Sequence, residues 1–382
     1  MSYIIAIGLY LVLLMVYGLV IAHKKVKTTD DMMTGGHKIP FIILVGSLLA
    51  TWCGGGGITG SAGVVYTGGP WVGALAYAAP PIGIILLYFI AGRVRKTNKV
   101  TVPEIMGARY GAAASVISAL CVMLAYVGVL ATQLKAAADI LVLLCHSSGI
   151  EISHGVALAI CTVIIVIITV GGGLVSVAYS DAVSALIMIG GFFLAIPILV
   201  HVANSQGAVL PPEKASFTGG LSGWTLLGYF LPGLSLMLGD QNMLQRFASA
   251  KNSDEAKKSN IGMFIGELLV IISIIALVTQ AAKLYPSLDT PSNVIFQVAV
   301  DYLPLVFGAL VMCACMAFIV TTADSYLLSS ATNLTNDIYV KYINKNATDR
   351  QKMNVLRATI VVFSVIAVAL TCLLYTSPSP RD

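Results

Sequence analysis

The chain has 382 residues, of which 58% are hydrophobic and only 10% are charged. A soluble globular domain carries about 25% charged residues, so this composition excludes that class and predicts an integral membrane protein. The net charge of +5 would suggest a nucleic-acid partner only if it were gathered on a soluble face, so we expect none. The seven cysteines form no CxxC pair and no zinc-ligand spacing, so we expect neither a metal cofactor nor a disulfide framework.

Apolar segments long enough to cross a bilayer recur along the whole chain. They predict ten spans, at residues 3–22, 41–66, 71–92, 113–144, 154–170, 182–202, 224–245, 259–281, 303–340 and 355–375. The first has no basic leader and no small-residue cleavage site, so we expect it to be retained. With alternating spans, 18 of the 22 Lys and Arg fall on one side and only Lys214 and Lys283 on the other. Basic connections favour the inner side, which predicts an N-terminus outside.

The second span contains four consecutive glycines, Gly54 to Gly57, in its middle. Each costs a helix about 1 kcal/mol relative to Ala. Irregular backbone at membrane depth persists only where protein or a polar cavity takes up its N–H and C=O groups, and in transporters such a break marks the binding site. The alternative is a small-residue face for close helix packing.

Six ionisable residues fall inside spans, where they are costly and favour a functional role: Lys135, Asp139, Asp181, Asp240, Glu267 and Asp324. Lys135 and Asp139 are four residues apart near a span end, which favours an interfacial pair. Asp240 follows Pro232–Gly233, which predicts a second broken span, with a simple proline kink as the alternative.

Hydroxyl groups are concentrated in residues 316–339, where Thr321 and Thr322 are followed by Asp324, Ser325 and a pair of serines. Hydroxyl and carbonyl oxygens are the hard ligands that an alkali cation needs when it leaves water. Such side chains also bond the preceding helical turn, which is the alternative.

No catalytic motif is present: the chain lacks HExxH, GxSxG and a phosphate-binding G-x-x-x-x-G-K-[ST] loop. We therefore expect no enzyme activity and no organic cofactor. The final residues 376–382 do not continue the apolar pattern, and we expect them to be a non-native tail on a chain that stops early.

Six ordered motifs resemble the sodium:solute symporter family, which includes carriers of proline, pantothenate and galactose. They are VKTTDDMMTGG, SLLATWCGGGGITGSAGVVY, TVPEIMGARYG, GGGLVSVAYSDAVSALIMIGG, GDQNMLQRFASAKNSDEAKK and VTTADSYLLSSATNLTNDIY, and the resemblance covers about residues 5 to 370. It implies an all-α polytopic membrane protein with a LeuT-like 5+5 inverted repeat and one extra N-terminal helix. The single transporter domain is expected over 1–375, with the first repeat at about 41–202. The second repeat begins at about 224 and is C-terminally incomplete.

The resemblance also implies site residues. Sodium would bind the backbone carbonyls of Ala50, Cys53 and Phe318 and the hydroxyls of Thr321 and Thr322. Asp181 matches the family's acidic residue that assists sodium release, with a helix N-cap as the alternative. The candidate solute contacts are Trp52, Gly54, Gly55, Tyr66, Gln133, Asp240 and Gln241. The stretch TWCGGGG is also faintly similar to the choline-transporting branch, where an aromatic ring faces a quaternary ammonium.

The expected function is sodium-coupled symport of a small organic solute by alternating access. The partners would be Na+, the solute and the lipid bilayer, and the expected location is the plasma (inner) membrane. A solute sensor and a proton-coupled carrier are the alternatives, and an intramembrane enzyme is disfavoured because the buried acids are scattered.

Overall fold

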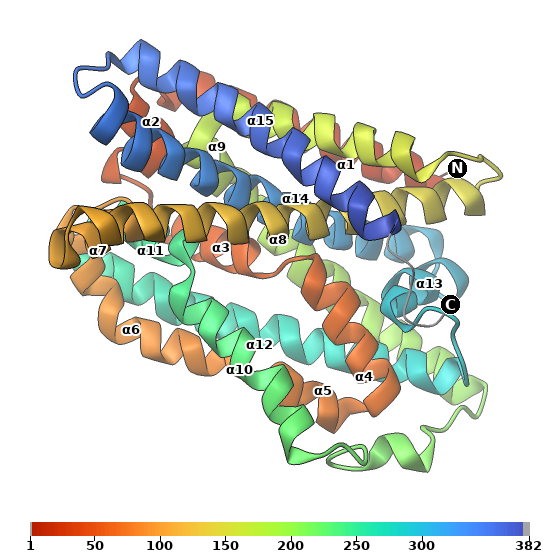
Figure 1. The fold of residues 1–382 in the computed structure, drawn as a ribbon. Helices are drawn as coiled ribbons and strands as arrows, with labels where there is room; N and C mark the ends of the chain where they lie inside the picture. Colours follow the sequence, from red (N-terminus) through yellow and green to blue (C-terminus); the bar gives the residue numbers. More distant parts are fainter. Residues whose placement is uncertain (1, 377–382) are drawn as a thin grey trace.

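The computed structural model describes residues 2–376, which form helices and no strand apart from an isolated bridge between Ile39 and Ala250. The expected non-native tail lies outside the described residues except for Thr376. Figure 1 shows the long helices running along a common direction, with the short helices α2, α7 and α11 at one end and α13 at the other. An all-helical bundle is what the bilayer demands, since a helix satisfies its backbone polar groups internally.

The first half of the chain contains α1 (Ser2–Lys25), α2 (Thr29–Thr34), α3 (Phe41–Trp52), α4 (Ala62–Gly68), α5 (Pro70–Ala76), α6 (Ala79–Thr97), α7 (Val102–Tyr110), α8 (Ala112–Ser147) and α9 (His154–Ser205). The second half contains α10 (Gly223–Gly239), α11 (Gln241–Ser249), α12 (Ser253–Leu284), α13 (Val294–Asp301), α14 (Leu305–Thr332) and α15 (Asp349–Thr376). Two π-helical segments, Gly57–Ser61 and Asn333–Ile343, precede α4 and follow α14. Short 3₁₀ turns cover Gly35–His37, Pro212–Ala215 and Pro291–Asn293.

The second span is broken at the glycines, as the sequence predicts. Helix α3 ends at Trp52, and Cys53 is extended, with φ −72° and ψ 91°. The helix that resumes from Gly57 to Gly68 is bent by 62° from α3. This segment is therefore two half-helices joined at Cys53 and Gly54.

The connection between the predicted spans 154–170 and 182–202 is shorter than expected, because α9 is helical from His154 to Ser205 except at Gly173. Gly173 has φ 55° and ψ −158°, and a Cβ there would lie 2.6 Å from the Met32 carbonyl oxygen. The polypeptide therefore changes direction at one glycine against α2. Asp181 lies inside the helix, so the N-cap alternative is also wrong.

The second broken span is present, but its break is not at Pro232–Gly233. Pro232 lies within α10, and the chain leaves the helix at Asp240, with φ −71° and ψ 111°. The Asp240 side chain accepts a hydrogen bond from the Asn242 N–H and caps α11. The capping carboxylate marks the break better than the proline does.

Among the described residues, seven helices are long and apolar enough to cross a membrane, or eight if the bent α3 pair counts as one span. The predicted ten would divide α9 at Gly173 and include α10, which has 17 residues. The ten-span division and the domain limits stay predictions.

Helix α14 forms the centre of the bundle. It packs against α9, α8, α1 and α15, and 72% of its most apolar stretch is buried, compared with 28% for α1. Its hydroxyl groups therefore face protein rather than lipid, which places them opposite the broken α3.

Candidate ion and solute site

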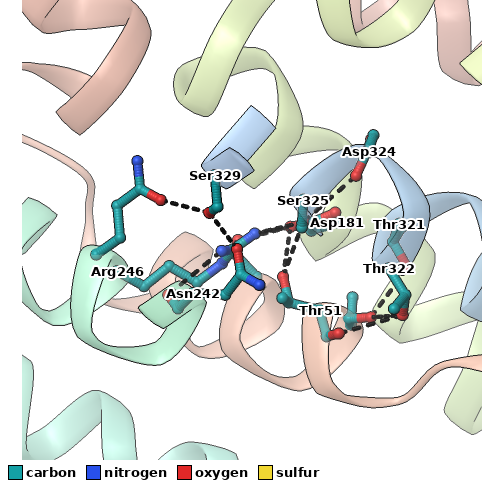
Figure 2. Close-up of polar contacts among 12 residues, drawn as sticks. Thr51, Asp181, Asn242, Arg246, Thr321, Thr322, Asp324, Ser325 and Ser329 are labelled. Carbon is teal, nitrogen blue, oxygen red and sulfur yellow. Dashed lines mark hydrogen bonds and ion pairs between the residues drawn. The ribbon is translucent and has the colours of Figure 1, made fainter. Parts of the chain in front are cut away.

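The carbonyl oxygens at the end of α3 face two hydroxyl groups of α14 (Figure 2). Thr321 Oγ1 lies 3.0 Å from the Ala50 carbonyl oxygen, and Thr322 Oγ1 lies 3.1 Å from that of Thr51 and 3.2 Å from that of Cys53. Thr321 Oγ1 also approaches the Phe318 carbonyl at 3.5 Å. The structure thus brings together all five residues that the resemblance implies for sodium.

Helix ends explain why these carbonyls are available. The last turn of a helix has no intrahelical donors for its C=O groups, and the break creates such an end inside the protein. Thr321 also donates to the Ala317 carbonyl at 2.6 Å, so the back-bonding expected of a helical threonine coexists with its contact to Ala50. Six oxygens, four carbonyls and two hydroxyls, gather here in a buried position, which suits a small alkali cation.

A second buried polar cluster lies beside the first and centres on Asp181. Its Oδ2 accepts hydrogen bonds from Ser47 at 2.6 Å and Thr51 at 3.3 Å, and pairs with Arg246 Nη2 at 3.1 Å. Figure 2 shows Thr51 between the two clusters: its carbonyl meets Thr322 and its hydroxyl meets Asp181 and Ser325. Thr51 therefore joins Asp181 to the expected sodium ligands.

The basic character of Arg246 suggests a solvated connection between spans, but the structure places it elsewhere. It is completely buried, and its guanidinium also donates to Ser47 at 2.7 Å and to Ser325 at 2.7 Å. Helix α11 begins at the Asp240 break, and this places Arg246 against α3 and α14.

A cavity of about 390 Å³ opens beside the α3 break. Its walls include Trp52, Cys53 and Gly54 at the break, Gln133 of α8, Tyr77, Tyr229, Glu267 of α12, and Phe318, Thr322 and Tyr326 of α14. Three expected solute contacts, Trp52, Gly54 and Gln133, line it. A fourth, Gly55, donates its N–H to Gln133 Oε1 at 2.7 Å.

The other three expected solute contacts lie outside the cavity wall. Tyr66 donates to the Tyr285 carbonyl at 3.0 Å, and the Lys214 ammonium lies 4.1 Å from its ring centre. Asp240 accepts hydrogen bonds from Tyr126 at 2.5 Å and Tyr326 at 2.7 Å.

Gln241 donates from its Nε2 to Asn333 and accepts from the Val102 N–H. Like Tyr66 and Asp240, it connects elements of the fold.

Sequence reasoning missed several residues of the site. Glu267 carried a signal, an acid in an apolar span, but it received no role. Tyr77, Tyr126 and Tyr326 carried none, because an aromatic residue in an apolar span usually packs.

The expected pair of Lys135 and Asp139 is present at 2.9 Å, with side chains 42% and 31% exposed. His154 Nε2 also lies 3.1 Å from Asp139 Oδ1. This group is partly exposed and lies apart from the buried clusters.

A bundle of apolar helices, interrupted at a glycine break that faces buried hydroxyl groups beside a cavity, defines a helical membrane protein of the LeuT-like fold class. The chain belongs to the sodium:solute symporter family, whose sequence profile matches residues 32–377. This family consists of transporters and not enzymes.

Curated relatives cover nearly the whole chain. High-affinity choline transporter 1 of Drosophila melanogaster is 25% identical over 98% of this chain. The sodium/sialic acid symporter NanT of Aliivibrio fischeri is 25% identical over 98%, and the osmoregulated proline transporter OpuE of Bacillus subtilis is 25% identical over 96%. The chain spans 62% of the Drosophila protein and 76% and 77% of the two bacterial ones.

Solved structures show the same fold. A Na+-coupled sialic acid symporter in a substrate-bound outward-open state has a TM-score of 0.82 at 18% identity, over 99% of this chain and 83% of that one. Mhp1, a nucleobase-cation-symport-1 family transporter, has a TM-score of 0.65 at 12% identity, over 91% of this chain and 74% of that one.

Proposed function

We propose that the protein is a sodium-coupled symporter of a small organic solute. One observation carries this proposal: the Thr321 and Thr322 hydroxyls lie within 3.0–3.2 Å of the carbonyl oxygens of Ala50, Thr51 and Cys53. Sodium would bind these oxygens together with the Phe318 carbonyl. Because the ligands come from a broken helix and from α14, the ion would hold the two elements together.

Coupling follows from the shared break. Sodium bound to the Cys53 carbonyl orders the backbone that also forms the cavity wall at Trp52 and Gly54. Sodium thereby raises the affinity for solute, and by reciprocal linkage bound solute must raise the affinity for sodium by the same factor. Alternate exposure of the site to the two sides then lets sodium, which moves down its gradient, carry the solute in the same direction.

Asp181 would assist sodium release. Its Oδ1 is buried and makes no hydrogen bond within the part of the chain that the structure describes, so it is a ready acceptor beside the ligands. Thr51 connects Asp181 to the sodium ligands, because its carbonyl accepts from the Thr322 hydroxyl and its own hydroxyl donates to Asp181 Oδ2.

Solute would occupy the cavity beside Trp52, Gly54, Gly55 and Gln133. The relatives are named for choline, proline and sialic acid, which differ in charge, so the family alone does not select a solute class.

The basic residues support a plasma-membrane topology with the N-terminus outside. A single cysteine introduced at Lys283 should react with an impermeant maleimide on intact cells, and one introduced at Lys27 should react only after the cells are permeabilised. Labelling of both from the same side would contradict this topology.

The test of the function is uptake into proteoliposomes, with and without an inward sodium gradient. Thr322→Ala should raise the sodium concentration for half-maximal uptake about 10-fold, since one hydrogen-bonding or ligand oxygen contributes about 1–1.5 kcal/mol. Thr322→Ser keeps the oxygen and should stay close to wild type. Thr162→Ala, which removes a hydroxyl bonded only to its own helix, is the matched control. An unchanged sodium requirement in Thr322→Ala would reject the ion site, and uptake driven by a pH gradient without sodium would favour proton coupling.

A further inference from the structure

Glu267 is a buried carboxylate without a cationic partner. It projects from α12 into the cavity wall and is 3% exposed. Its carboxylate accepts hydrogen bonds from the Cys53 thiol at 3.1 Å and from the Trp52 side chain, and neither of these donors carries a positive charge. None of the ion pairs formed by the residues that the structure describes includes Glu267.

The cavity wall offers no positive charge to balance this carboxylate. Its described lining residues include no Lys, Arg or His, and Glu267 is its only Asp or Glu. Arg246, the buried base of the neighbouring cluster, is bound to Asp181, Ser47 and Ser325. An unpaired charge in a low-dielectric site is costly, so a cation that enters the cavity gains a strong partner.

The remaining lining favours the same kind of ligand. Five aromatic residues contribute to it: Trp52, Tyr77, Tyr229, Phe318 and Tyr326. Aromatic faces attract an organic cation and do not attract an anion.

Several donors that an anion would need are already used. Tyr77 donates to the Gly57 carbonyl at 2.5 Å, Tyr326 to Asp240 at 2.7 Å, and Thr132 to the Val129 carbonyl at 2.7 Å. At the start of the second half-helix, where an anion would be favoured, the Gly55 N–H is taken by Gln133.

We propose that the transported solute carries a cationic nitrogen, which the Glu267 carboxylate and the surrounding aromatic rings recognise. This inference rests on the proposed function and names the solute class for the same cavity. It holds for an organic ammonium ion and for a zwitterion with such a nitrogen, and the experiment separates these two.

The test compares ligands of matched shape on the purified chain in sodium, by thermal stabilisation and by inhibition of uptake. Choline carries the cationic nitrogen, 3,3-dimethylbutan-1-ol replaces that nitrogen with carbon, glycine betaine adds a carboxylate, and proline and N-acetylneuraminate complete the panel. A nitrogen cation or zwitterion should bind at least 10-fold more tightly than the carbon analogue and N-acetylneuraminate. Tighter binding of choline than of glycine betaine would identify the solute as an ammonium ion. Tighter binding of glycine betaine would identify it as a zwitterion.

Variants tie the preference to Glu267. Glu267→Gln should abolish the preference for the cationic nitrogen while sodium alone still stabilises the protein, which shows that the fold and the ion site persist. Glu267→Asp keeps the charge and should keep the preference. Glu213→Gln, in the exposed outer connection, is the matched control.

The outcomes separate the two proposals. Tighter binding of the neutral or anionic ligand, or sodium stabilisation with no response to any nitrogen cation, overturns the inference and leaves sodium symport standing. A Glu267→Gln variant that keeps the cation preference also overturns it. Absence of any sodium effect on stability or uptake instead rejects the proposed function.

Discussion

Arg246 and Asp181 form an ion pair whose two side chains are fully buried. Removing one partner of such a pair leaves an uncompensated charge and typically costs about 3–5 kcal/mol. Arg246→Met should therefore lower the thermal midpoint of the detergent-solubilised protein markedly, and Arg350→Met, at an exposed position, should not. The double variant Asp181→Asn, Arg246→Met should lose less than the sum of the single changes, because it removes both charges. Additive losses would show that the pair is not coupled.

Residue chemistry could be predicted where composition made it unusual. Thr321 and Thr322 stood out as adjacent hydroxyls in an apolar span, and the structure places both against the broken α3. Arg246 could not be placed, since an arginine near a span end ordinarily belongs to a solvated connection. Its burial depends on the Asp240 break, which turns α11 toward α3.

At the scale of one element, the glycines at the α3 break have different surroundings. A Cβ on Gly54 would lie 3.0 Å from both Thr322 Oγ1 and Cγ2, whereas one on Gly56 meets nothing within 4 Å. Gly54→Ala should weaken the stabilisation of the solute-free protein by sodium several-fold, because Thr322 must move. Gly56→Ala should leave it unchanged. Equal sodium responses, read as the shift in thermal midpoint with sodium concentration, would contradict the close approach.

A second element-scale prediction concerns the turn in α9. Gly173 has a positive φ and backbone of α2 against its Cα, so Gly173→Ala should destabilise the protein by more than about 1 kcal/mol. Gly190, on the same helix, has open space around its Cα, and Gly190→Ala should be neutral or stabilising by up to about 1 kcal/mol. The thermal midpoints of the two variants test this prediction. An unchanged midpoint for Gly173→Ala would show that the α2 backbone can shift to accommodate the added Cβ.

Elements were predictable to the extent that their cause is local. The glycine run broke α3 because four glycines remove the intrinsic preference for helix. The span predicted to end at residue 170 instead continues as helix, and within α9 the backbone departs from helical angles at Gly173. Pro232 also lies within a helix, α10, although it lacks the N–H that an internal helical hydrogen bond needs, and only Met237 of that helix is buried.

At the scale of the whole molecule, transport of sodium together with a solute bearing net positive charge moves charge across the membrane. An inside-negative potential of 100 mV adds about 2.3 kcal/mol for each charge moved. In proteoliposomes, a potassium diffusion potential of this sign should speed the sodium-dependent uptake of whichever solute the binding panel identifies, and collapsing it with an ionophore should remove the gain. An uptake rate that does not change with the membrane potential would contradict electrogenic symport.

The thiol of Cys53 lies on the cavity wall, against Glu267 and beside the break. Cys145, Cys161, Cys313 and Cys315 are buried elsewhere, and Cys121 and Cys372 are exposed on α8 and α15. The protein thus carries a native chemical reporter: the speed at which a water-soluble thiol reagent modifies Cys53 measures how far water reaches the break. Because the same sulfur shares its carboxylate partner with the solute, occupancy of the cavity would be read as protection from the reagent.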